Sequence, residues 1–364
     1  MNEPILINLS KIGKHGTGMY NFSNDVLSTL TDNNIFFDIL ASKGVSYVHE
    51  GKNRIEAPEW VSSGANVSAL RPVFWQLYMM TAKYPYKYAL STTHHFLPQI
   101  HHQIATVHDL RPYYYPDSVS QKIYFHCILP KKIKKADGIF TVSETTKKAI
   151  HGVYCVPSDK IHVIGNIVDT TDFSFYAGEE REKYLLAVGA TWKHKNIIEL
   201  IENNEFWKEK YNLVIVSGEG KYRDFLCRKV KEKGLDANVK FLSFVERDRL
   251  ISLYQKASAL VFPSIDEGFG IPPLEAMSCG TPAIVSDIPV FREIYESAPI
   301  YVNLGNKESW KMAFKQLEDK ALLSEKQKLG FMQAKKYTRE RFESRLMMAL
   351  DDVWPELGIK RDMQ

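Results

Sequence analysis

Short hydrophobic runs alternate with amphipathic stretches along most of the 364-residue chain. The first run, Ile5–Leu9, is followed by a glycine-containing segment and then by apolar residues at helical spacing, among them Phe22, Val26 and Leu30. Strand-like runs that alternate with helical stretches predict parallel α/β layers. The strands predicted in the first part of the chain are Ile5–Leu9, Ile35–Leu40, Ile104–Val107, Gly138–Val142 and Ile161–Ile164.

The same pattern begins again after a polar segment, Asn166–Gly178. This repetition predicts two doubly wound domains that face each other across a cleft. The strands predicted in the second part are Tyr184–Val188, Leu213–Val216, Val239–Phe241, Ala259–Phe262, Pro282–Val285 and Ile300–Val302. The last helix, about Arg339–Trp354, has Phe342, Leu346 and Leu350 on one stripe, which must pack against another element.

Composition supports a globular protein: 45% of the residues are hydrophobic and 25% are charged, which excludes disordered and collagen-like classes. The four cysteines are far apart in sequence and lack metal-site spacing, so we expect reduced thiols. The chain starts without a signal-peptide pattern, and no run approaches 18 apolar residues. We therefore expect a cytoplasmic protein without a transmembrane segment.

The net charge of +4 is unevenly distributed, because residues 1–170 contain 17 Lys and Arg against 13 Asp and Glu. Four of these lysines lie within Lys131–Lys135, and the aromatic and basic residues of the same half include Tyr84, Tyr86, Tyr88, Lys83 and Lys87. Two interpretations are open: a solvated helix face, or peripheral contact with an anionic membrane. Nucleic-acid binding is disfavoured, since no recognition fold is visible.

The segment Glu267–Met277 contains the densest chemical signal. It follows a predicted strand, and its prolines suit the first turn of a helix. The free N–H groups and the dipole at that helix start favour phosphate, while Gly268 and Gly270 let the backbone approach a ligand. Glu267 and Glu275 bracket this position, and their carboxylates can accept hydrogen bonds from sugar hydroxyls.

The stretch PSIDEGFGIPPLEAMSCGTPAIVSDIPVFREI, around this segment, closely resembles the donor site of retaining glycosyltransferases of family 4. The resemblance implies an α/β protein of the GT-B fold, with two facing Rossmann-like domains and a cleft between them. We expect an acceptor-binding domain over residues 1–168 and a nucleotide-sugar domain over 169–338. A C-terminal helix, 339–364, is expected to pack back on the first domain.

The family's donor residues can be placed on this sequence. The resemblance implies that Glu267 contacts the transferred sugar and that Glu275 holds the ribose of the nucleotide. It implies that backbone amides of Phe269, Gly270 and Ile271 face the sugar and the diphosphate.

Two further stretches of the second half resemble the family. Val188–Asn196 matches its diphosphate clamp, in which Lys195 fits the family lysine. The family arginine is replaced by Ala190 or Thr191, and Lys193 is the candidate substitute. The resemblance also implies that the backbone at Phe244 and Val245 reads the nucleobase.

In the first half, His108 and Asp109 follow a predicted strand and match the family's HD segment. The resemblance implies that His108 contacts the donor sugar, and Asp109 is expected to support the loop or contact the acceptor. Gly16, Thr17 and Gly18 resemble the glycine-rich loop beside the donor diphosphate.

Two alternative kinds of site are disfavoured. A dinucleotide-binding enzyme would use the first glycine loop and Asp38, but Asn21 stands where the third glycine is needed. The pairs His94-His95 and His101-His102 are disfavoured as metal ligands, because adjacent histidines point in different directions and no carboxylate or cysteine cluster completes a shell. There is also no D-x-D triplet, so we expect no metal and no other cofactor.

The resemblance implies transfer of a hexose, with retention, from a nucleotide sugar to a hydroxyl of a glycan or a polyprenyl-diphosphate-linked acceptor. GDP-mannose is the favoured donor, because the VHDL and EGFGIPPLEAMSCGTP segments are typical of bacterial mannosyltransferases of surface-polysaccharide assembly. The alternatives are a UDP-sugar donor and an inactive nucleotide-sugar-binding subunit. A phosphorylase or an epimerase of the same fold also stays open. A phosphorylase needs a pyridoxal-binding lysine context, which is not visible here, and an epimerase would act without an acceptor.

Overall fold

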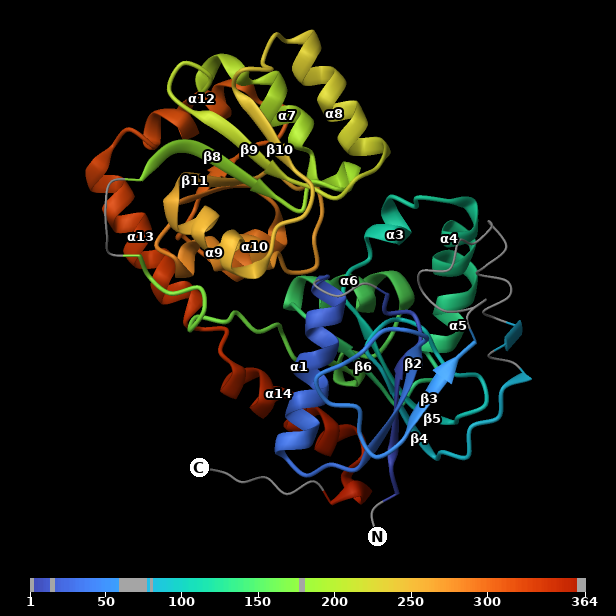
Figure 1. The fold of residues 1–364 in the computed structure, drawn as a ribbon. Coiled ribbons are helices and arrows are strands. Elements are labelled where there is room, and N and C mark those ends of the chain that lie inside the picture. The colour runs from blue at the N-terminus through green and yellow to red at the C-terminus, as the bar shows by residue number, and fades with distance from the viewer. Residues whose placement is uncertain (1–2, 14–16, 59–76, 79–80, 177–180, 359–364) are drawn as a thin grey trace. The chain divides into compact units, whose positions relative to one another are not determined.

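The computed structural model describes residues 3–13, 17–58, 77–78, 81–176 and 181–358 (Figure 1). The chain divides into two compact units. The first consists of Met1–Ile167 and Glu340–Gln364, and the second of Val168–Arg339. Each unit contains its own parallel sheet, with helices packed on it.

The first unit is built on a seven-stranded sheet of order β3-β2-β1-β4-β5-β6-β7. Its strands are β1 (Ile5–Leu9), β2 (Phe37–Ser42), β3 (Arg54–Ala57), β4 (Tyr88–Ser91), β5 (His102–Val107), β6 (Gly138–Thr141) and β7 (Ile161–Val163). The strand order reverses between β1 and β4, where Ile7 of β1 pairs with Ile39 on one side and Leu90 on the other. Open parallel sheets bind ligands at the carboxyl ends of such a switch point.

Helices follow most of these strands. They are α1 (Gly18–Asp32), α3 (Arg111–Tyr114), α4 (Val119–Ile123), α5 (Leu129–Ile133), α6 (Glu144–Tyr154) and α14 (Arg339–Val353). A π-helical turn, η1 (Tyr124–Ile128), joins α4 to α5, and short 3-10 turns lie at Ser158–Lys160 and Pro355–Leu357. The apolar stripe predicted for α1 is buried against the sheet, including Phe22, Val26 and Leu30.

The last helix belongs to the first unit. Phe342 of α14 packs edge-on against Phe22 of α1, and Asn33 donates a hydrogen bond of 2.6 Å to Glu343. Beyond the helix, the Trp354 indole N–H donates to Asp137 over 2.7 Å. The predicted stripe of Phe342, Leu346 and Leu350 is buried, and Phe342 has its partner in α1.

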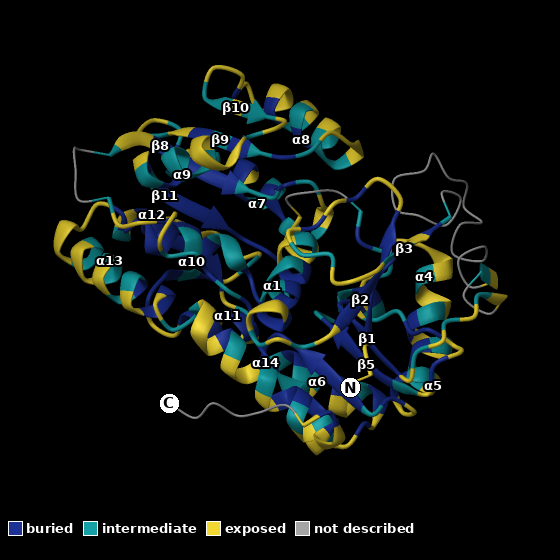
Figure 2. Cartoon of the chain, turned by 60° about the horizontal axis from the view of Figure 1, so that its bottom comes forward, coloured by how far each residue is buried: buried dark blue, intermediate teal, exposed yellow. Residues whose placement is uncertain are grey.

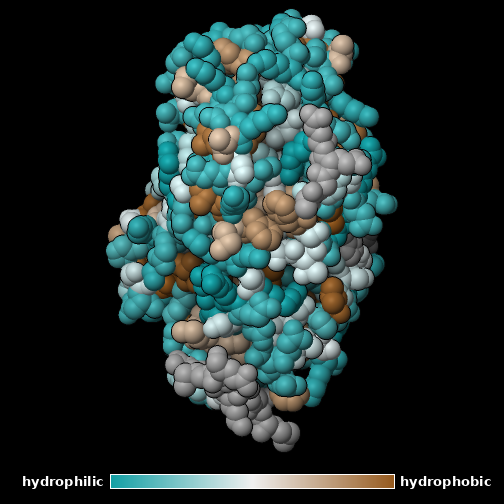
Figure 3. Space-filling model, turned by 90° about the vertical axis from the view of Figure 1, so that its left-hand side faces the viewer, coloured by the Kyte–Doolittle hydropathy of each residue, from teal (hydrophilic) through white to brown (hydrophobic). Residues whose placement is uncertain are grey.

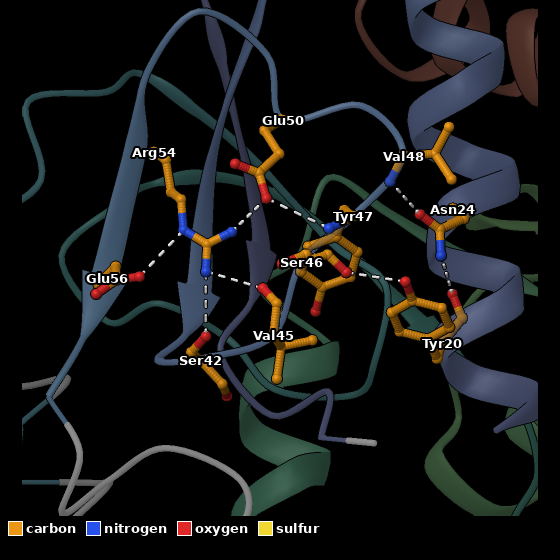
Figure 4. A network of polar contacts seen from close by, with 10 residues as sticks. All are labelled: Tyr20, Asn24, Ser42, Val45, Ser46, Tyr47, Val48, Glu50, Arg54 and Glu56. Carbon is orange, nitrogen blue, oxygen red and sulfur yellow. Dashed lines mark hydrogen bonds and ion pairs between the residues drawn. The ribbon is translucent and has the colours of Figure 1, made fainter. Parts of the chain in front are cut away.

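Arg54 organises the connection between β2 and β3 (Figure 4). Its guanidinium donates to the Val45 carbonyl at 2.8 Å and pairs with Glu50 and Glu56. On the other side of this loop, Tyr20 of α1 donates to the Ser46 carbonyl over 2.8 Å. The loop is therefore tied both to the sheet edge and to the helix that follows the glycine segment.

The second unit is built on a six-stranded parallel sheet of order β10-β9-β8-β11-β12-β13. Its strands are β8 (Glu182–Val188), β9 (Asn212–Val216), β10 (Val239–Leu242), β11 (Ala257–Phe262), β12 (Ala283–Ser286) and β13 (Ile300–Val302). Its helices are α7 (Ile197–Glu202), α8 (Lys221–Glu232), α9 (Arg247–Lys256), α10 (Ile271–Ser278), α11 (Pro289–Tyr295), α12 (Lys307–Gln316) and α13 (Lys320–Ala334), with 3-10 turns at Lys193–Lys195 and Asn204–Phe206. The switch point of this sheet lies between β8 and β11.

The predicted α/β class, with two Rossmann-like parallel sheets, is confirmed, but two strands were missed. The prediction lacked β3 and β4, which have only four residues each. β3 lies at the sheet edge and its sequence, RIEA, contains two charged residues. The strand expected at Ile35–Leu40 lies two residues later, at Phe37–Ser42.

The prediction of an exposed aromatic surface beside Lys83 and Lys87 was wrong in part. The Tyr86 hydroxyl donates to Asp38 over 2.6 Å, and the Tyr84 hydroxyl donates to that of Tyr78. Tyr88 is fully buried and donates to Glu356. These rings are used inside the first unit, because their hydroxyls satisfy internal polar groups.

Burial follows the layers in both units, with buried strands and helices that expose one side (Figure 2). On the face drawn in Figure 3, hydrophilic residues dominate and hydrophobic residues form small, separate groups. No helix in the described part of the chain is long and apolar enough to cross a membrane.

Candidate active site

Lys195 and Glu267 meet at the switch point of the second sheet. Lys195 ends the turn after β8, and Glu267 lies in the loop after β11. The Lys195 ammonium lies 2.5 Å from Glu267 Oε1, and both side chains are largely buried. The ammonium also lies 4.7 Å from the centre of the Phe262 ring. The pair therefore places one cation and one carboxylate where this fold binds ligands.

The loop that carries Glu267 runs directly into α10. Helix α10 begins at Ile271 with prolines in its first turn, as predicted. Gly270 has a φ of +87°, and a side chain there would clash with Tyr295 and Phe291. The Tyr295 hydroxyl donates to the Gly270 carbonyl over 2.5 Å. Only glycine fits this position, and the anchored carbonyl leaves the amides at the helix start available for an anion.

Glu275 lies one turn into α10 and accepts a hydrogen bond from the Tyr254 hydroxyl over 2.8 Å. Burial raises the pKa of Glu275 to about 6, although Tyr254 and the charge of Arg247 lower it. Arg247 is itself held by Asp172 and Asp169, at 2.7 and 2.8 Å. At neutral pH Glu275 is thus an ionised carboxylate in a partly buried setting, suited to accept hydrogen bonds from hydroxyl groups.

The other predicted residues of the second unit are more exposed. Lys193 is exposed at the start of the turn that ends with Lys195. The Thr191 hydroxyl, where the family arginine is absent, accepts a hydrogen bond from the Gly218 amide over 3.0 Å. Phe244 follows β10 with 81% of its side chain exposed, and Val245 is partly buried. The polypeptide at these positions is therefore open to a ligand.

In the first unit, His108 follows β5 and is held from two sides. Its Nε2 lies 2.9 Å from the Thr92 carbonyl oxygen, and its ring packs edge-on against Phe22 at 4.6 Å. A carbonyl accepts only from a protonated nitrogen, so Nε2 carries the hydrogen. Burial lowers the pKa of His108, which keeps the ring neutral and leaves its lone pair on Nδ1.

The neighbouring predicted residues act locally. Asp109 accepts a hydrogen bond from the Arg111 amide at 3.0 Å, at the start of α3. The Thr17 hydroxyl accepts from the Tyr20 amide over 3.3 Å and caps α1, which begins at Gly18. Gly16 lies outside the described residues.

The expectation that His94 and His95 point in different directions was wrong. Their rings pack against each other with centres 4.3 Å apart. Both residues lie in the loop after β4, where the alternation of a strand no longer applies. Within the described residues, no group of three or more histidine, cysteine or acidic side chains could hold a metal ion.

Asp38, the ribose-binding candidate of a dinucleotide enzyme, is used for structure. It lies near the start of β2, is buried, and accepts hydrogen bonds from Tyr86 and from the Asn53 amide. A ribose-binding carboxylate belongs at the carboxyl end of this strand. The position of Asp38 therefore argues against that alternative.

Sequence reasoning missed the residues that support the site. Tyr254, Arg247 and Tyr295 are distant in sequence from the residues that they position. The sequence contains no local signal for them, since each is an ordinary residue of an amphipathic helix and gains its role only when the helices pack.

Two known families match most of the chain between them. Residues 169–330 match the family described as "Glycosyl transferases group 1", and residues 72–172 match "Glycosyltransferase Family 4". The first range contains the Lys195–Glu267 pair and α10, and the second contains His108.

Individual relatives extend this similarity over most of the chain. The O-antigen chain mannosyltransferase RfbU of Salmonella typhimurium is 43% identical over 322 residues, which cover 86% of this chain and 91% of the relative. The O-antigen chain mannosyltransferase B of Escherichia coli is 26% identical and covers 67% of this chain and 69% of its own.

Solved structures show the same fold at low identity. Sucrose-phosphate synthase of Thermosynechococcus elongatus superposes with a TM-score of 0.77 at 17% identity, covering 97% of this chain and 100% of the other. The expected GT-B fold is confirmed by this likeness.

Proposed function

Since this chain belongs to the glycosyltransferases, with one region of group 1 and one of family 4, we propose that it transfers mannose from GDP-mannose, with retention, to a hydroxyl of a lipid-linked glycan in O-antigen assembly. The observation that carries the proposal is the 43% identity with an O-antigen chain mannosyltransferase over 91% of that relative's length. The geometry of the second unit supplies groups that suit the donor half of this reaction.

On the donor side, Lys195 and the first amides of α10 would bind the diphosphate. Both offer positive potential to a group whose negative charge grows as the bond to the sugar breaks, which is an effective form of catalysis. Glu267 would accept hydrogen bonds from hydroxyls of the mannose, and Glu275 would accept from those of the ribose.

The reaction then exchanges one bond at the anomeric carbon. The bond from this carbon to the β-phosphate oxygen breaks, and the acceptor oxygen forms the new bond on the same face. The acceptor proton passes to the departing phosphate oxygen. Neutral His108 would orient a sugar hydroxyl through its Nδ1 lone pair. This route needs no covalent nucleophile, and we expect it to need no metal.

Donor binding tests the proposal directly. Calorimetry should give tighter binding for GDP than for UDP, and GDP-[14C]mannose should label a lipid extract that contains the acceptor. NMR of the product should show the α-anomer of the donor retained. Preference for UDP would exclude the GDP-mannose donor and favour the UDP-sugar alternative.

One observation keeps an inactive binding subunit as the second candidate. Thr191 occupies the place of the family arginine and is bound to the Gly218 amide, so it adds no positive charge to the site. The test uses lipid extracts to which a related mannosyltransferase transfers labelled mannose. If this protein binds the nucleotide but transfers no mannose to the same extracts, the inactive binding subunit is favoured.

We also propose that the first unit contacts the membrane that holds a lipid-linked acceptor. Val119 and Ile123 of α4 are 75% and 51% exposed. Figure 2 shows α4 in the colours of exposed and intermediate residues. Tyr114 and Tyr115 are also exposed nearby in the sequence. Exposed lysines, namely Lys122, Lys131, Lys134 and Lys135, accompany this apolar group. Apolar and basic side chains together suit the surface of an anionic bilayer.

A further inference from the structure

Lys132 differs from the other lysines of Lys131–Lys135, because its ammonium group is buried. Lys131, Lys134 and Lys135 are exposed on the same stretch. Among the described residues, no acceptor lies within hydrogen-bond distance of Lys132 Nζ. Burial disfavours the charged form and lowers the pKa of Lys132. A buried cation of this kind is unfavourable unless something binds it.

The neighbouring histidines are held in place by other residues. His94 and His95 pack ring to ring, and the Tyr124 hydroxyl donates to the His94 carbonyl over 2.8 Å. The Asn8 side chain donates to the His95 carbonyl at 3.1 Å. The His95 ring nitrogen Nδ1 lies 3.0 Å from the Thr93 hydroxyl. The loop is therefore held by contacts within the first unit.

Positive charge converges on these two rings. Burial is the main cause that lowers the pKa of His95, and the charges of His94, Lys11 and Lys132 lower it further. Burial, His108 and Lys11 lower the pKa of His94 to about 3. Both imidazoles are thus neutral at pH 7, and each carries an N–H that can donate to an acceptor.

The cluster lies where its sheet binds ligands. Lys11 follows β1, and His94 and His95 follow β4, so the two loops begin at the switch point between these strands. Lys132 comes from α5, which packs through Ile133 and Leu129 on the core of the first unit. Three separate segments therefore bring basic groups to the carboxyl edge of the sheet.

We propose that Lys11, Lys132, His94 and His95 bind a phosphate group of the acceptor. A phosphate oxygen would accept hydrogen bonds from the Lys132 ammonium and from imidazole N–H groups, which supplies the partner that Lys132 lacks among the described residues. The inference rests on the proposed function and specifies its acceptor as a phosphate ester. A phosphate group could also come from free diphosphate, so the two sources must be tested separately.

The test is calorimetry on the full chain with inorganic diphosphate and with farnesyl diphosphate. Saturating GDP, or UDP if that is the nucleotide bound, occupies the donor site throughout. Lys132→Met removes the charge and keeps most of the length of the side chain, and Lys148→Met is the matched control at an exposed lysine of α6. We expect Lys132→Met to weaken binding of farnesyl diphosphate by roughly tenfold or more, and Lys148→Met to leave it unchanged.

A second readout separates binding from a structural role. Loss of a buried cation that has no partner among the described residues should raise the melting temperature of the protein measured without added diphosphate, whereas loss of a structural contact would lower it. If Lys132→Met does not fold, NMR of the wild-type histidine rings replaces it. Farnesyl diphosphate should then raise the pKa of His94 and His95, because a bound anion favours imidazolium.

The outcomes are distinct. The proposed phosphate site is contradicted if wild type and Lys132→Met bind farnesyl diphosphate with equal affinity. It is also contradicted if Lys132→Met and the control variant lose the same amount of affinity. Binding of inorganic diphosphate alone would overturn the assignment to the acceptor. If neither nucleotide binds, the proposed function fails independently, because that binding is measured before any diphosphate is added.

Discussion

The Lys195 ammonium and the Glu267 carboxylate form an ion pair of 2.5 Å, so two groups expected to serve the donor neutralise each other. A donor diphosphate would compete with Glu267 for Lys195. Its arrival would release the carboxylate for the hydroxyls of the sugar. In the proposed function, the pair would thus couple binding of the phosphates to release of the carboxylate that contacts the sugar.

This relationship predicts the effect of Glu267→Gln. GDP affinity should stay unchanged or become up to roughly tenfold tighter, because Lys195 no longer has a competing carboxylate. Turnover should fall by roughly 100-fold or more, because a charged contact to the moving sugar is lost. Calorimetry and initial rates measure the two effects, with the exposed Glu308→Gln as control. Weaker GDP binding in Glu267→Gln would contradict the assignment.

Glu275→Gln should change GDP affinity and protein stability in opposite directions. Its GDP affinity should fall by roughly 1–3 kcal/mol, because an ionised acceptor for the ribose hydroxyls becomes neutral. Its stability at pH 7 should rise, because burial raises the pKa of Glu275 from 4.5 to about 6. That shift corresponds to about 2 kcal/mol at most.

The pH dependence follows from the same shift. The folded state holds the Glu275 proton more tightly than the unfolded state, so this contribution to stability is present below pH 4.5 and is lost as the pH rises through about 6. Denaturant titrations of wild type and Glu275→Gln between pH 4 and 7 should diverge in that direction. Parallel curves would show that Glu275 does not titrate in this range.

The sequence predicted the second unit better than the first for a physical reason. Glycines and prolines of the α10 segment mark a helix start by local geometry, so Gly270 and Pro272 could be placed before any packing was known. Most strands of that sheet are buried apolar runs, and these show clearly in sequence.

The first unit depends more on tertiary packing. Strand β4 has only four residues, and its importance comes from lying beside β1 at the switch point. Missing it concealed the position of His94 and His95 beside that switch point. The burial of Lys132 was equally invisible, because a run of lysines predicts a solvated face and only the packing of α5 buries one of them.

Metal removal should leave transfer intact. Within the described residues there is no cluster of acidic, histidine or cysteine side chains that could hold a cation, and in the proposed function Lys195 and the α10 amides would offset the diphosphate charge. Rates in excess EDTA should match those in magnesium within roughly twofold. Activity that EDTA abolishes and manganese restores would show that the leaving group depends on a metal.

Membrane contact should depend on the exposed lysines of the first unit and not on Lys132. Three of the four lysines in Lys131–Lys135 are exposed, and each is worth about 1 kcal/mol at an anionic surface. The triple change of Lys131, Lys134 and Lys135 to Glu should therefore abolish sedimentation with anionic vesicles. Val119→Ser combined with Ile123→Ser should weaken this sedimentation at high salt, where the apolar contribution dominates.

The matched control changes three exposed lysines of the second unit, Lys315, Lys320 and Lys328, to Glu and alters the net charge equally. If this control loses binding to the same extent, the attraction is a property of the net charge, and the α4–α5 face has no special role.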